Sequence, residues 1–84
     1  MHLQCYPNPA AGTLHIVFST AENSMVKIGM YNIYSRLISE ITDTAGVQEE
    51  KSISMDASGM IPGIYLLRMQ AGDRIADSRM AIIH

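Results

Sequence analysis

Apolar and polar residues alternate with a period of two along much of this 84-residue chain. The alternation covers residues 13–19, 25–30, 52–55 and 79–83. Because successive side chains of a strand point to opposite faces of a sheet, this spacing places the apolar residues of each segment on one face. Each segment is therefore predicted to be a half-buried strand.

Clusters of turn-forming residues interrupt the alternation at roughly 12-residue intervals. The six clusters are 6–12, 21–24, 32–35, 43–46, 56–63 and 71–73. Six breaks imply seven short segments, which is typical of an antiparallel sandwich or barrel. For a single domain of this length, here residues 1–84, we predict an all-β, immunoglobulin-like antiparallel sandwich of about seven strands.

Two segments depart from simple alternation. Residues 63–70 are apolar on both faces apart from Arg68 and Gln70, so we expect a central strand that is covered on both sides. Residues 35–41 have apolar side chains at helical spacing, but 38–44 are rich in branched residues and lack a long amphipathic run. We therefore predict a strand there as well.

The inward faces of these strands define the expected core. It consists of Leu14, Ile16, Phe18, Val26, Ile28, Met30, Ile53, Leu66 and Ile82. Apolar residues make up 48% of the chain and charged residues 17%, a composition too hydrophobic for an intrinsically disordered segment.

Composition and charge also exclude several classes of function. The sequence contains neither an apolar run long enough to span a bilayer nor the basic-then-apolar start of a signal peptide. Six Lys and Arg against eight Asp and Glu give a net charge of −2, and the basic residues do not cluster. Nucleic-acid binding is therefore not expected.

The residues that could carry chemistry are few and scattered. Cys5 is the single cysteine, and we interpret it as a small buried residue rather than a reactive thiol. His2, His15 and His84 have no carboxylate at the spacing of a metal site. Nucleophile-elbow and glycine-rich phosphate motifs are absent from the sequence, so we expect no catalytic residue, metal, cofactor or small-molecule substrate.

Some acidic and aromatic residues could serve either a binding site or the fold. Asp56, Asp73 and Asp77 could in principle bind calcium, but no loop of alternating oxygen donors contains them, and turn capping is the more ordinary role. Tyr31 and Tyr34 flank a predicted turn and could stack on a sugar ring, although aromatic residues beside a hairpin commonly cover the edge of the core.

Two motifs place strong demands on the backbone. Residues 6–10, YPNPA, here called the proline segment, contain two prolines and so cannot pair as a central strand; we expect an extended segment or turn at an edge. Residues 62–65, PGIY, combine a preset turn residue with a glycine that can adopt positive φ and an apolar strand start.

In this order, these motifs resemble the C-terminal sorting domain of the type IX, or Por, secretion system of Bacteroidota. The resemblance covers nearly the whole chain, through YPNPAAGTLHIVF, VKIGMYNIYSRLI, SISMDASGMIPGIYLLRM and RMAIIH. The chain departs from the family at Ser35, where a glycine is usual, so the turn there is expected to differ or to be strained. It also has Ser78 and Arg79 in place of a commoner pair of lysines.

The resemblance implies a role in protein export. Such domains lie at the C-terminus of larger secreted proteins, pass through the periplasm and are recognised by an outer-membrane translocon and a shuttle protein. A sortase-like cysteine peptidase commonly removes them and attaches the cargo to anionic lipopolysaccharide at the cell surface. On this view the chain is a substrate of that peptidase and is not itself an enzyme.

The resemblance and the strand pattern together suggest which residues a receptor recognises. These are Pro62, Gly63, Tyr65, Arg79, Met80, Ala81, Ile82, Ile83 and His84. Alternatively, they serve the fold as turn and core residues. Two other functions remain open from the sequence: an accessory sandwich for adhesion or glycan binding, and an uncleaved docking domain on a component of the secretion machinery.

Overall fold

The computed structural model of the chain describes residues 2–20, 24–45 and 50–83, and all regular structure in these ranges is β-strand. The strands are β1 (His2–Tyr6), β2 (Thr13–Ser19), β3 (Ser24–Tyr31), β4 (Leu37–Ala45), β5 (Lys51–Asp56), β6 (Gly63–Ala71) and β7 (Arg74–Ile82). The described residues form no helix that could cross a membrane. The strand predicted around residues 35–41 is confirmed as β4. The break predicted at 43–46 is wrong at its start, because β4 continues to Ala45, and residues 46–49 lie outside the described ranges.

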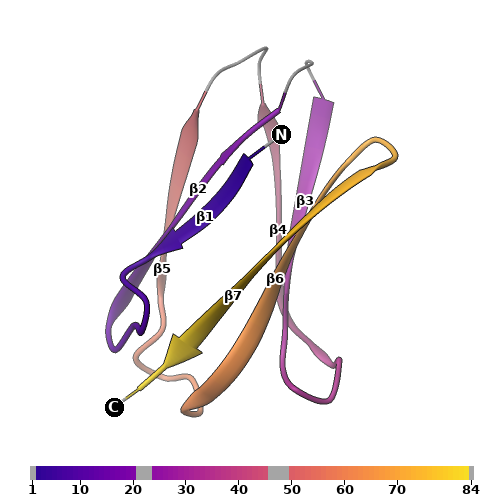
Figure 1. The fold of residues 1–84 in the computed structure, drawn as a ribbon. Helices are drawn as coiled ribbons and strands as arrows, with labels where there is room; N and C mark the ends of the chain where they lie inside the picture. Colours follow the sequence, from indigo (N-terminus) through magenta and orange to yellow (C-terminus); the bar gives the residue numbers. More distant parts are fainter. Residues whose placement is uncertain (1, 21–23, 46–49, 84) are drawn as a thin grey trace.

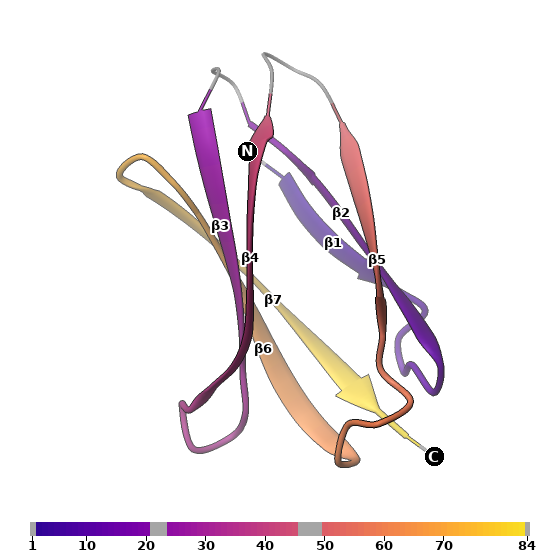
Figure 2. The same ribbon diagram turned by 180° about the vertical axis from the view of Figure 1, so that it is seen from behind.

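The seven strands form two antiparallel sheets that face each other (Figures 1 and 2). One has the order β1-β2-β5 and the other β4-β3-β6-β7. The predicted seven-stranded antiparallel sandwich is therefore confirmed. It differs from a constant-type immunoglobulin domain in that the fourth strand pairs with the third strand and not with the fifth.

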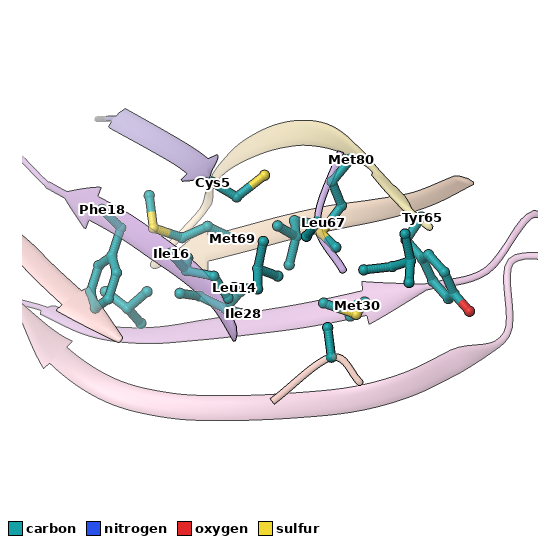
Figure 3. Packing of buried hydrophobic residues seen from close by; sticks show 14 of the residues in the cluster. Cys5, Leu14, Ile16, Phe18, Ile28, Met30, Tyr65, Leu67, Met69 and Met80 are labelled. Atoms are coloured by element: carbon teal, nitrogen blue, oxygen red, sulfur yellow. The ribbon is translucent and has the colours of Figure 1, made fainter. Parts of the chain in front are cut away.

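The core lies between the two sheets and is built from the inward faces of both (Figure 3). Most of the predicted core residues are at most 2% exposed: Leu14, Ile16, Phe18, Val26, Ile28, Met30 and Ile82. Ile53 is half-buried and packs against this cluster. The alternation of apolar residues therefore predicted the inward faces well.

The prediction for β6 needs correction. The strand is central, because β3 and β7 pair with its two edges, but the other sheet covers one of its faces and leaves the other open. Tyr65, Leu67 and Met69 point into the core, whereas Ile64 is 53% exposed. Leu66, which we predicted in the core, alternates with these inward residues and is half-buried on the outer face. Both faces of this strand are apolar, yet only the inner face is buried against the other sheet.

Tyr65 ties the start of β6 to the connection that precedes it. Its ring is 7% exposed at one end of the core (Figure 3), and its hydroxyl donates a hydrogen bond to the carbonyl oxygen of Ile61. A tyrosine bonded to the backbone a few residues upstream is the tyrosine corner of immunoglobulin-like sandwiches. Gly63, between these two residues, has φ 157°, which a side chain rarely permits.

Asn32 organises the turn between β3 and β4. Its side-chain Oδ1 accepts hydrogen bonds from the backbone N–H groups of Tyr34 (2.9 Å) and Arg36 (3.0 Å). Its own N–H donates to the carbonyl of Arg36 at 3.0 Å. Within this turn Ser35 has φ 62°, in the left-handed region where a Cβ atom is strained, so the strain expected from the sequence is present.

Replacing Ser35 by glycine is expected to stabilise the domain. The substitution removes the left-handed strain, and after the entropic cost of a glycine the gain is about 0.5–1 kcal/mol, or a rise of a few degrees in Tm. Thermal unfolding followed by circular dichroism measures it. Ser35→Ala retains the Cβ atom and is the matched control; an equal shift in both variants would show that backbone strain is not the cause.

Candidate interaction surface

Pairing between β6 and β7 brings the sequence-predicted recognition residues together. The two strands are antiparallel, with Gly63 opposite Ile82, Ile64 opposite Ala81 and Tyr65 opposite Met80. The motif at 62–65 and the tail at 79–83 are therefore neighbours at one end of the sandwich. We call this end, formed by residues 6–12, 32–36, 57–64 and 79–83, the C-terminal pole (Figure 1).

Burial divides the predicted residues into two groups. Tyr65, Met80 and Ile82 are 7%, 1% and 1% exposed, so they hold the sandwich together and present little surface. The exposed members are Pro62, Gly63, Arg79 and Ile83, with Ala81 half-buried. His84 lies outside the described residues. A partner that contacts the folded domain can therefore reach the second group and not the first.

The proline segment covers the outer edge of β7. The side-chain amide of Asn8 accepts a hydrogen bond from the Ala81 N–H (2.9 Å) and donates one to the carbonyl of Arg79 (3.3 Å). The Ala10 N–H donates to the Ala81 carbonyl, and the Ile83 N–H donates to the Ala10 carbonyl, both at 2.8 Å. The segment therefore lies at an edge, as expected, and takes the place of a neighbouring strand along 79–83.

No local pattern in the sequence identifies the partner of this segment. A proline lacks the N–H needed for a regular ladder, so a side-chain amide between the two prolines supplies both the donor and the acceptor instead. An asparagine flanked by prolines was the available signal, but nothing in it points to a strand 73 residues away.

Cys5 lies on the same side of the sandwich as the proline segment. Its Sγ is 3.9 Å from the Ser78 hydroxyl oxygen, linking β1 to β7, and the residue is 8% exposed. Burial raises the pKa of the thiol, and the hydrogen bond with Ser78 only partly opposes this effect. The thiol is therefore neutral at physiological pH, in agreement with its interpretation as a buried structural residue.

Two of the three acidic residues considered as calcium ligands, Asp56 and Asp77, have local partners. Asp56 accepts hydrogen bonds from the Ser58 hydroxyl (2.6 Å) and N–H (2.9 Å), and these bonds lower the pKa of its carboxyl. Asp77 accepts two hydrogen bonds from Arg68, at 2.8 and 3.1 Å, which lower its pKa in the same way. Across the described ranges no group of three or more His, Cys, Asp or Glu residues is placed to hold a metal ion.

A groove of about 230 Å³ opens at the C-terminal pole. One wall is the turn between β3 and β4 with the start of β4, represented by Ile33, Tyr34 and Ile38. The other wall is the connection into β6, represented by Ile61, Pro62 and Ile64. Pro62, Gly63 and Tyr65 line this groove and were among the residues predicted for recognition. Ile33 and Ile61 were not predicted, and their only signal was a large apolar residue within a turn.

Comparison with protein families gives a match over nearly the whole chain. A family model described as a secretion system C-terminal sorting domain matches residues 4–83. A comparison with curated proteins gave no match.

Removing the Asn8 amide is expected to loosen the tail without unfolding the domain. Asn8→Ala loses two hydrogen bonds to β7, which should cost about 1–2 kcal/mol and speed hydrogen exchange at the Ala81 N–H. Asn8→Asp keeps the acceptor and loses the donor, so Ala81 should stay more protected in that variant. NMR hydrogen exchange measures both, with the Met69 N–H in the central strand as internal control. Unchanged exchange at Ala81 in Asn8→Ala would contradict this role.

Proposed function

The chain belongs to the family of secretion system C-terminal sorting domains, and from this membership we propose that residues 1–84 form the C-terminal domain of a larger protein exported by the type IX system. A domain of this family marks the protein that carries it for export to the cell surface or the extracellular space. The family is a sorting-signal family and not an enzyme family.

The proposed route follows from the type IX resemblance. The cargo crosses the periplasm, where a shuttle protein and the outer-membrane translocon recognise the folded domain. A sortase-like cysteine peptidase then removes the domain and joins the cargo to anionic lipopolysaccharide. In these steps the chain is the sorting signal that the translocon recognises and the substrate that the peptidase cleaves.

One observation carries the proposed mode of recognition: the β6–β7 pairing. It places the exposed Gly63 opposite Ile82 and so beside the exposed Ile83, with Arg79 three residues further along, opposite Leu66. The N-terminal end of β1 lies at the opposite end of the sandwich from the C-terminal pole (Figures 1 and 2). On this proposal the cargo precedes β1, so it joins the domain away from the pole and leaves these residues open to a receptor.

A reporter fusion tests the sorting role. Residues 1–84 placed behind a periplasmic reporter, in a host with the type IX machinery, should carry the reporter to the cell surface or the medium. Export is measured by fractionation and by protease accessibility on intact cells. The same fusion in a strain without the translocon is the control. A reporter that stays in the periplasm with the domain folded would contradict the proposal.

Shortening the tail tests whether the receptor reads this end. Deletion of Ile83 and His84 removes one half-exposed side chain and the hydrogen bond to Ala10, so the expected loss of stability is about 1–2 kcal/mol. The Tm should fall by only several degrees, whereas export of the reporter should be lost. Melting temperature and export are measured on the same protein, and export at the intact level would show that these residues are dispensable.

A further inference from the structure

Exposed apolar side chains concentrate at the groove of the C-terminal pole. The described residues include ten large apolar side chains that are exposed, and half of them line this one groove: Ile33, Tyr34, Ile38, Ile61 and Ile64. Tyr34 and Ile61 are 82% and 79% exposed. Small soluble domains rarely gather apolar residues in this way unless the patch binds a partner.

Both walls of the groove are fixed by hydrogen bonds. The Asn32 side chain accepts hydrogen bonds from the backbone N–H groups of Tyr34 and Arg36, which hold the turn that carries Ile33 and Tyr34. The Tyr65 hydroxyl holds the carbonyl of Ile61 in the opposite wall. A preformed groove does not have to be ordered when a ligand enters, so apolar contacts made there contribute more of their free energy to binding.

The size of the groove favours a polypeptide over a small molecule. Its volume of about 230 Å³ is below the range of roughly 300–1,000 Å³ usual for small-molecule sites. It suits one or two large side chains of a partner that continues over the surrounding surface.

The charges around the groove indicate the character of that partner. The ion pairs among the described residues are Lys51–Asp43 and Arg68–Asp77. Four cations have no carboxylate partner within the described ranges, namely Lys27, Arg36, Arg74 and Arg79, and of these Arg36 and Arg79 belong to the C-terminal pole. Arg36 closes the turn held by Asn32. Arg79 lies in β7 opposite Leu66, which is two residues along β6 from Ile64 in the wall of the groove. The carboxylate of Asp56 at the same pole is engaged by Ser58.

From the preformed apolar walls and the two arginines at this pole that lack a carboxylate partner among the described residues, we propose that this groove is a docking site for a segment of a secretion-machinery protein. The segment inserts one or two large apolar side chains between the walls and places carboxylates against Arg36 and Arg79. This inference rests on the proposed sorting function and adds Ile33, Tyr34, Ile38 and Ile61 to the recognition surface.

Export of the reporter fusion tests the apolar part. Ile33→Ser combined with Ile61→Ser should reduce export at least tenfold, with the Tm close to that of the unmodified domain because both side chains are exposed. The matched control is Met25→Ser with Ile75→Ser, which removes two exposed apolar side chains from the other end of the same sheet. Unimpaired export of the groove variant would overturn the inference, whereas retention of the unmodified fusion would overturn the sorting function itself.

Charge reversal tests the acidic character of the partner. Arg36→Glu with Arg79→Glu should reduce export at least tenfold in a domain that circular dichroism shows to be folded. Lys27→Glu with Arg74→Glu makes the same change in net charge at exposed cations away from the pole. An equal reduction in the two variants, or none in the first, would overturn the proposed complementarity.

A photo-crosslinking residue at position 61, with position 75 as control, identifies the occupant in exporting cells. The expected product joins position 61 to a segment of a secretion-machinery protein that combines large apolar and acidic residues, as mapped by mass spectrometry. A product joining two copies of the fusion, or the domain to its own reporter, would overturn the inference.

Discussion

The antiparallel pairing of β6 with β7 is the interaction on which the rest of the structure depends. It runs in continuous register from Gly63 opposite Ile82 to Ala71 opposite Arg74. Through it the last strand gains a fixed position, and its inward side chains, Met80 and Ile82, complete the core. The same pairing sets the outward residues of 79–83 beside residues 63–66, so one hairpin determines the geometry of a surface that two separate segments of the chain form.

Much of this architecture could be predicted from periodicity. Alternation identified the inward residues of β2, β3 and β7 correctly, because each of these strands has one apolar and one polar face. It failed for Leu66, since the apolar pattern of β6 gives no indication that the other sheet covers one face alone. Periodicity shows which faces of a strand are apolar, but it does not show which of those faces another sheet covers.

The candidate surface was predictable only in part, for a related reason. Pro62 and Gly63 were predicted because a proline followed by a glycine indicates a turn from the sequence alone. Ile33 and Ile61 lie in turns, where no periodic pattern marks them, and the groove exists because the two turns reach the same end of the sandwich. Asn8 likewise acquires its role from a strand that is remote in sequence. Contacts between separate segments are decided by topology, which local residue patterns do not contain.

The contact between the proline segment and β7 also has a consequence for the order of events in folding. The hydrogen bonds from Asn8 and Ala10 to residues 79–83 close a loop that includes almost the entire chain. Such high contact order slows folding relative to domains built from local contacts. A ribosome makes residues 79–83 after the other strands of the domain, so this side of the sandwich cannot close until those residues have been synthesised. Its closure therefore requires that every strand of the domain has already been made.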